Sequence, residues 1–152
     1  MLRSATRHDL EIAASWVTTA RECELWAGRR VRFPIDLDAL METMAFATTG
    51  ALVLEVDARI VALGQIVVKS GGRAHLARLI VAPEHRGKHL GTRLVSLLLE
   101  RARKSGHRMA SLNVDPGNAT AIALYSKLGF ADAPRPDDEP DPYGSRYMER
   151  SL

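Results

Sequence analysis

A short basic turn containing two glycines has the residue types of an anion-binding site. The turn reads Arg86-Gly87-Lys88-His89-Leu90-Gly91, and it follows an apolar, β-branched run that stops at Pro83. A long segment with helical spacing of apolar residues begins within it. The first N–H groups of a helix have no partner inside the helix, and the helix dipole adds partial positive charge there. We therefore predict that this turn binds a phosphate or pyrophosphate group, assisted by its basic side chains.

A second pair of residues that could do chemistry lies further along the chain. Asn118 and Tyr125 are seven residues apart in a segment predicted to be helical, so two helical turns bring both side chains to one face. A tyrosine hydroxyl can act as a general acid, and a tyrosine ring can also simply complete the packing of a half-buried core. The residues alone leave both interpretations of Tyr125 open.

The first half of the chain changes from helical to extended patterns. Helical spacing is present over Asp9–Val17, with Thr6 as the cap, and again from Asp36 to Gly50. The segment Glu22–Pro34 contains a glycine and a proline and is interpreted as a helix end followed by a loop. Three β-branched runs then predict an antiparallel meander, over Ala51–Val56, Arg59–Lys69 and Ala74–Val81.

The second half alternates helices and strands. The predicted elements are a helix over His89–Ser105, a strand over Met109–Val114, a helix over Asn118–Leu128, a strand over Gly129–Ala133, an acidic proline-rich loop over Pro134–Tyr143 and a strand over Tyr147–Leu152. The strands Ala74–Val81 and Met109–Val114 are joined through a helix, so they should be parallel. With an edge strand over Leu2–Ala5, the order predicts one α/β domain over residues 1–152, with four helices and a mixed sheet of about seven strands.

Composition and charge exclude several function classes. The net charge of +3 comes from interspersed charges, which is not the footprint of a nucleic-acid-binding protein. The single Cys23 excludes an internal disulfide, and the five histidines have no metal-binding spacing, so no metal site is predicted. The N-terminal residues lack the apolar core of a signal peptide, and no apolar run approaches the roughly 18 residues of a membrane span. We therefore expect a cytoplasmic protein that does not act at a membrane.

Two motifs together resemble those of the GNAT superfamily of acyl-CoA-dependent N-acyltransferases. The first is the R/Q-x-x-G-x-G/A pyrophosphate loop, present as Arg86–Gly91, and the second is N-x-x-A-x-x-L-Y-x-K-x-G-F, present as Asn118–Phe130. The order of predicted elements is also similar over nearly the whole chain. One position differs, because His89 stands where the family has its first motif glycine. Its side chain could crowd the pyrophosphate, or it could lean outward and leave the backbone N–H in place.

The resemblance implies that acetyl-CoA is the co-substrate, with no metal, and it assigns residues to its binding. The pyrophosphate would rest on backbone N–H groups of the turn from Arg86 to Thr92, and the pantetheine arm would pair with exposed backbone at Ile80 and Val81, between two splayed strands. Asn118 would also contact the cofactor. The acceptor amine would attack the thioester directly, and Tyr125 would donate a proton to the departing thiolate.

The residue that removes a proton from the acceptor ammonium is left open. Many members of the family place a glutamate for this task on the meander strand, and the corresponding position here is His75. A histidine with a pKa near 6.5 is a competent base at neutral pH, and an exposed strand histidine beside the Gly71-Gly72 turn is an equally weighted alternative. Glu22, Glu24 and a relayed water are further candidates for the base.

Three neighbouring features are interpreted as structural. Arg78 alternates out of phase with His75, so both face one groove only if a bulge intervenes, and a surface charge on a strand is favoured for Arg78. Core packing is favoured for Trp26 over a place in the wall of an acceptor pocket. An acidic proline-rich loop is more often simply solvated than a site that attracts a cationic acceptor, and here its carboxylates are Asp137, Asp138, Glu139 and Asp141.

These observations lead to one main hypothesis and one alternative. The main hypothesis is an N-acetyltransferase whose acceptor is a small-molecule amine or a peptide or protein amino group. The alternative is a non-catalytic acyl-CoA-binding sensor or assembly module, and Tyr125 favours the enzyme. A Rossmann-type nucleotide-binding domain fits poorly, because its glycine motif follows the first strand of a βαβ unit, whereas a meander precedes this turn. The oligomeric state is open between a monomer and a homodimer.

Overall fold

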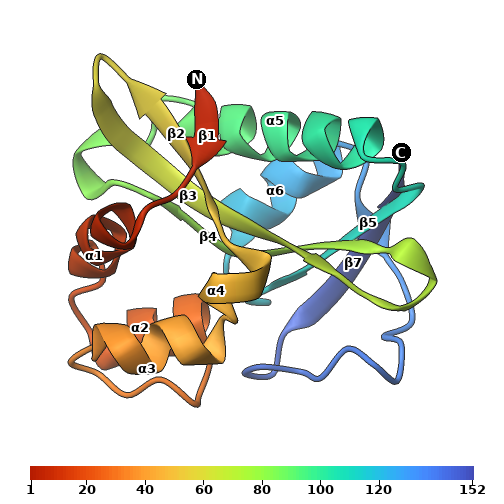
Figure 1. Ribbon diagram of the computed structural model, residues 1–152. Coiled ribbons are helices and arrows are strands. Elements are labelled where there is room, and N and C mark those ends of the chain that lie inside the picture. The colour runs from red at the N-terminus through yellow and green to blue at the C-terminus, as the bar shows by residue number, and fades with distance from the viewer.

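The computed structural model describes residues 1–152 and shows one seven-stranded sheet with helices on both faces (Figure 1). The strands are β1 (Leu2–Ser4), β2 (Leu52–Val56), β3 (Arg59–Val68), β4 (Ala74–Val81), β5 (Met109–Val114), β6 (Ala131–Asp132) and β7 (Arg146–Ser151). The helices are α1 (Arg7–Ser15), α2 (Ala20–Ala27), α3 (Leu37–Thr43), α4 (Phe46–Thr49), α5 (Leu90–Lys104) and α6 (Ala119–Lys127). Short 3₁₀ turns lie at Ser70–Gly72 and Pro83–His85.

The order of strands confirms the predicted topology. The strands lie in the order β1-β2-β3-β4-β5-β7-β6, so β1 is an edge strand and β2, β3 and β4 form the predicted meander. β4 and β5 are parallel, as their helical connection requires, and the remaining pairs are antiparallel.

The predicted number of helices is too low, because two short helices interrupt segments that were interpreted otherwise. Within Glu22–Pro34 the first residues belong to α2, whose N-terminus is capped by the Thr19 side chain accepting from the N–H of Glu22. A helix of eight residues shows too few turns for a clear apolar period. The predicted helix after Asp36 divides into α3 and α4 at Ala45, where φ is 50°.

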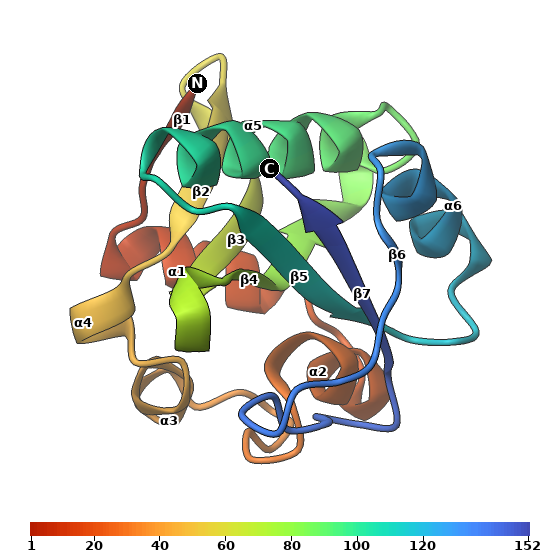
Figure 2. The ribbon, with the colours of Figure 1, turned by 90° about the vertical axis from the view of Figure 1, so that its right-hand side faces the viewer.

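The two faces of the sheet carry separate apolar cores, and Figure 2 shows the helices that cover each face. One core joins α1, α2 and α3 to the sheet, through residues such as Leu10, Trp26, Leu40 and Leu63. The other joins α5 and α6 to the opposite face, through residues such as Leu94, Leu98, Leu112 and Phe130. None of the helices is long and apolar enough to cross a lipid bilayer.

Strands β4 and β5 separate soon after they begin to pair. Their ladder runs only from Ala74 and Ala110 to Leu76 and Leu112, although β4 continues to Val81. Beyond Leu76 the edge of β4 that faces β5 therefore has no strand partner. This is the splay that the resemblance implies.

A bulge in β4 lies within this unpaired part. Leu63 of β3 pairs with Ile80 and Gln65 pairs with Ala77, so Arg78 and Leu79 together oppose the single residue Gly64. Arg78 takes a left-handed backbone conformation, with φ of 53°. A Cβ at Gly64 would lie 2.8 Å from Cδ2 of Leu79, so glycine is what allows the bulge to pack against β3.

Candidate active site

A cleft of about 760 Å³ opens where β4 and β5 separate. Its walls come from these two strands, from α2 and α6, and from the loop before β7. Five residues predicted for the site line this cleft, namely His75, Ile80, Arg86, Asn118 and Tyr125. Val81 and the turn Gly87–Thr92 adjoin the cleft along the chain but are not among its lining residues. The structure thus brings the candidates from the two motifs to one place.

The basic turn presents a row of free donors. The backbone N–H groups from Gly87 to Thr92 donate to no acceptor within the protein, and α5 begins in their midst at Leu90. The side chains of Arg86, Lys88 and Arg93 are exposed around them. Unpaired N–H groups, a helix N-terminus and nearby cations are together what an anionic group needs.

His89 takes a left-handed backbone conformation of the kind that favours glycine. Its φ and ψ are 62° and 16°, which is the left-handed region, and its side chain is exposed. Histidine adopts this region more readily than bulky or branched residues do, at a modest energetic cost. The side chain therefore leans outward, and the N–H of His89 remains part of the row of free donors.

Asn118 and Tyr125 line the same cleft from α6. Asn118 caps this helix, because its Oδ1 accepts from the N–H of Ala121 at 3.0 Å, and its amide nitrogen is left free. Tyr125 is half-buried, with its ring packed edge-on against Phe130 at 6.0 Å between centroids. Burial, followed by the proximity of Tyr143, raises the pKa of Tyr125 to about 12, so the hydroxyl keeps its proton at neutral pH.

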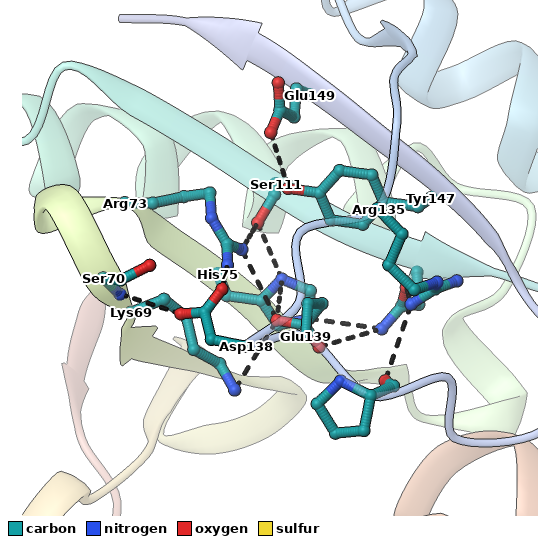
Figure 3. Close-up of polar contacts among 12 residues, drawn as sticks. Lys69, Ser70, Arg73, His75, Ser111, Arg135, Asp138, Glu139, Tyr147 and Glu149 are labelled. Atoms are coloured by element: carbon teal, nitrogen blue, oxygen red, sulfur yellow. Dashed lines mark hydrogen bonds and ion pairs between the residues drawn. The ribbon is translucent and has the colours of Figure 1, made fainter.

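His75 belongs to a buried polar network that no pattern in the sequence predicts (Figure 3). The residue is 4% exposed, and its Nδ1 lies 2.7 Å from Oγ of Ser111 and 3.4 Å from Oε1 of Glu139. Arg73 donates to the same Ser111 oxygen at 2.8 Å and lies 3.4 Å from the same Glu139 oxygen. The alternative of an exposed strand histidine is therefore wrong.

The network also determines the tautomer of His75. Arg135 donates to Oδ1 of Asn113 at 2.7 Å, so the amide nitrogen of Asn113 is directed to Nε2 of His75, 3.4 Å away. This nitrogen must then be an acceptor, and Nδ1 carries the proton toward Ser111. Burial, followed by the charges of Lys69, Arg73, Arg135 and Arg78, lowers the pKa of His75 to about 3. His75 is thus a neutral imidazole and a much weaker base than an ordinary histidine.

Part of the acidic loop is anchored rather than solvated. Glu139 is 5% exposed, and Lys69 and Arg73 lie within 3.5 Å of its Oε1. Asp138 accepts from the N–H of Ser70 and from Arg73 Nη2, both at 3.0 Å. These contacts tie the loop to the turn between β3 and β4. The spacing of charges along the chain could not reveal them, since the partners are more than 60 residues apart.

The two glutamates proposed as alternative bases already have hydrogen-bond or ion-pair partners within the protein. Glu22 lines the cleft, but its carboxylate accepts from the N–H and the hydroxyl of Thr18 at 3.1 and 2.9 Å. These hydrogen bonds lower the pKa of Glu22, which makes it a weaker base. Glu24 forms ion pairs with Arg21 and Arg29.

The bulge changes the interpretation of Arg78. It turns the side chain to the face of the sheet that carries His75 and Gln65, and both Arg78 and His75 line the cleft. Arg78 is half-buried, so the prediction of a surface strand charge is wrong. Trp26 is buried, as core packing requires, and it also lines the cleft and donates from its indole nitrogen to the carbonyl of Arg78 at 2.8 Å.

Known proteins with similar sequences and folds identify the family. The Acetyltransferase (GNAT) family matches residues 15–130. The IAA acetyltransferase of Azospirillum brasilense is 35% identical over 124 residues, which are 79% of this chain and 80% of that protein. The solved structure of yncA, a putative acetyltransferase from Salmonella typhimurium with acetyl-CoA, has a TM-score of 0.71 at 22% identity and covers 100% of this chain and 93% of its own.

A second solved structure with the same fold contains both CoA and spermine. Spermidine N-acetyltransferase from Vibrio cholerae in complex with CoA and spermine has a TM-score of 0.78 at 20% identity, covering 99% of this chain and 94% of its own. The chain belongs to the GNAT family of acetyltransferases. The resemblance carried by its two motifs is thereby confirmed, and the chain is an acyltransferase.

Proposed function

We propose that the chain moves the acetyl group of acetyl-CoA to a primary amine by direct attack. The observation that carries this proposal is the closeness along the chain of two features, the part of β4 that no strand pairs and the free N–H groups of Gly87–Thr92, which follow it after the short turn Pro83–His85. An open strand edge suits an extended, amide-containing arm such as pantetheine, and a row of N–H groups suits a pyrophosphate. The related structures that contain acetyl-CoA or CoA support the choice of co-substrate.

Each part of the co-substrate would meet a different group of residues. Acetyl-CoA would supply the activated thioester. The turn Gly87–Thr92 would hold the pyrophosphate through its N–H groups, with the charges of Arg86 and Lys88 beside it. Backbone atoms of Ile80 and Val81 would hold the pantetheine arm, and the free amide nitrogen of Asn118 would donate to it from the opposite wall.

Tyr125 would serve as the general acid. As the amine nitrogen bonds to the acetyl carbon and the carbon–sulfur bond breaks, the Tyr125 hydroxyl would give its proton to the sulfur. The proton that the new amide nitrogen then releases would return, through water, to the tyrosinate. The pKa of about 12 ensures that the proton is present at neutral pH. The same buried surroundings would also raise the pKa of the departing thiol beside the hydroxyl. The two pKa values would therefore stay close enough for the proton to pass from Tyr125 to the sulfur.

We assign removal of the ammonium proton to water in the cleft rather than to His75. A proton on Nε2 of His75 would oppose the amide N–H₂ of Asn113, and burial together with four nearby cations disfavours the imidazolium despite the Glu139 carboxylate 3.4 Å from Nδ1. His75 would instead hold the cleft wall in place through Ser111. Glu139 is similarly held, by Lys69 and Arg73.

The experiment that tests the function measures free-thiol release from acetyl-CoA across small amines and peptides with free N-termini. Release that depends on an amine, with acetylated amine as the product, supports the proposal. Acetyl-CoA should also raise the melting temperature, whereas NAD and ATP should not, because a ligand stabilises the native state that binds it. Binding of acetyl-CoA with no amine-dependent release would identify the non-catalytic acyl-CoA-binding module instead.

A further inference from the structure

Arg78 brings a positive charge into the cleft without a negative charge beside it. Its Nη1 donates to Oε1 of Gln65 at 2.8 Å, whereas its Nε is buried and has no hydrogen-bond partner. Nη2 makes no hydrogen bond either, and no carboxylate lies within ion-pair distance of the guanidinium. Buried guanidinium groups normally have a partner for each donor, because an unpaired buried charge is costly. Arg78, which lines the cleft, therefore carries a charge that no group of the protein balances.

Gln65 holds the guanidinium in position. It is fully buried, and its amide nitrogen donates to the carbonyls of Met44 at 2.7 Å and Gly50 at 2.9 Å. Since both N–H bonds are committed, Oε1 must point to Arg78. Trp26 holds the backbone of the same residue, through its indole N–H and the Arg78 carbonyl. The fold thus orders a charged side chain in a cleft and leaves its remaining donors free.

Most other charged side chains in the cleft have hydrogen-bond or ion-pair partners within the protein. The carboxylates that line it accept hydrogen bonds or ion pairs from the protein itself, and these are Glu22, Asp115, Glu139 and Asp141. Arg29 pairs with Glu24, and Arg86 donates to the Val81 carbonyl. Arg30, which lines the cleft and is exposed, has no ion pair. Arg78 and Arg30 are therefore cations of the cleft without a carboxylate partner.

The anion that Arg78 lacks is not the pyrophosphate of the co-substrate. Arg78 lies with Gln65 on the face of the sheet covered by α1–α4, whereas α5, whose N-terminus holds the free N–H groups, covers the opposite face. A guanidinium presents a planar set of donors that matches a carboxylate. The acceptor itself is the remaining ligand that can bring such a group.

We propose that the acceptor is an amine that also carries a carboxylate, as an amino acid does, and that Arg78 binds this carboxylate. The proposal rests on the N-acetyltransferase function above and names its substrate class. The carboxylate would occupy the free donors of Arg78 on the α2 side of the cleft. The amine would then point along β4 toward the thioester.

The test compares each standard amino acid with the amine that lacks only its carboxylate. Examples of such pairs are L-phenylalanine with 2-phenylethylamine and L-leucine with 3-methylbutylamine. Wild type should prefer the carboxylate member of at least one pair by about 10-fold or more in kcat/KM. Arg78→Met should lower kcat/KM for that amino acid by about 100-fold, mainly through KM, and change the matched amine by less than about 3-fold. Arg78→Lys should retain part of the preference, since it keeps the charge but loses the planar donor set.

Two controls separate this role from a structural one. Arg78→Met removes a half-buried charge but also the donor to the buried Oε1 of Gln65, so the two effects oppose each other and the melting temperature should change little. Arg59→Met removes the same charge from an exposed position outside the cleft and should change neither member of a pair. A readout that does not need turnover is the thermal shift caused by the preferred amino acid in the presence of CoA, which Arg78→Met should abolish.

Three results would overturn the proposal and leave the proposed function standing. One is amine-dependent thiol release with no preference for carboxylates in any pair. Another is an equal loss of kcat/KM for both members of a pair in Arg78→Met, which would mean that Arg78 acts on the thioester or only stabilises the fold. The third is a preference that survives Arg78→Met. If no amine supports thiol release, the proposed function fails. The carboxylate site has its own test: it is wrong if no amino acid raises the melting temperature in the presence of CoA.

Discussion

His75 and Ser111 are register partners in β4 and β5, and Nδ1 of His75 lies 2.7 Å from Oγ of Ser111. The contact is one residue before Leu76 and Leu112, the last positions at which the two strands pair. The polar network therefore closes the narrow end of the cleft. Because its members are buried, their protonation and their loss should be visible in the stability of the whole fold.

The free energy of unfolding should decrease in acid because His75 is buried in its neutral form. Its pKa is about 3 in the folded chain and near 6.5 when unfolded. Between these values the unfolded state binds one more proton, so stability falls by about 1.4 kcal/mol for each pH unit below 6.5. Urea unfolding of wild type and His75→Gln at several pH values measures this contribution. The variant should lack it, and equal pH slopes in both proteins would contradict the lowered pKa.

His75→Gln should also show that His75 is not the general base. Glutamine can accept from Asn113 and donate toward Ser111, so the cleft wall should stay in place. We expect kcat/KM to fall by less than about 10-fold, whereas loss of a general base usually costs 100-fold or more. The pH profile of kcat/KM should keep its shape in the variant. A large loss together with the disappearance of one limb of the profile would restore His75 as the base.

Tyr125→Phe tests the general acid with little disturbance of the fold. The Tyr125 hydroxyl makes no hydrogen bond within the protein, so the melting temperature should change little. We expect kcat to fall by about 100-fold or more, with the KM for acetyl-CoA nearly unchanged, because the proton is needed only as the thiolate leaves. Steady-state thiol release measures both parameters. Wild-type turnover by the variant would show that another group, or water, protonates the sulfur.

His89→Gly should relieve the left-handed backbone at the start of α5. Glycine adopts this conformation without the clash that a Cβ causes, so stability should rise by about 0.5 kcal/mol, and acetyl-CoA should bind at least as tightly. His89→Val should lower both, since β-branched residues strongly disfavour positive φ. Thermal unfolding with and without acetyl-CoA measures these effects.

His85→Gly is the matched control for this prediction. His85 lies in the preceding 3₁₀ turn and is not among the residues with positive φ, so glycine there has no strain to relieve and should lower stability. A stabilisation of similar size at both positions would show that the gain does not come from the backbone of His89.

Local patterns predicted most of the elements that form the proposed co-substrate site. The β-branched runs gave the meander its strands, and the helical connection between Ala74–Val81 and Met109–Val114 required a parallel pair. The seven-residue spacing of Asn118 and Tyr125 placed both at one cleft. These features depend on periodicity within single segments and on the handedness of connections, and both can be recognised along the chain.

The acceptor side could not be predicted in the same way, because contacts between distant segments create it. The bulge that turns Arg78 toward Gln65 depends on how two strands fit at Gly64, and neither strand shows it alone. Glu139 looked like one acid in a solvated loop, yet its partners come from the β3–β4 turn and from β5. The one available signal was Arg73, a charge directly before the first residue of β4.

The attachment of the acidic loop by Asp138 and Glu139 has a consequence for engineering this protein. The loop forms one wall of the cleft but is fastened at only a few points, to Ser70, Lys69, Arg73 and Asn113. Pro140, Pro142 and Tyr143 could therefore be exchanged to reshape the entrance, provided that Asp138, Glu139 and Asp141 remain, because Asp141 accepts hydrogen bonds from the N–H groups of Tyr143, Gly144 and Ser145. The row of donors at Gly87–Thr92 would be untouched by such a graft, so entrance shape and thioester supply can be redesigned independently.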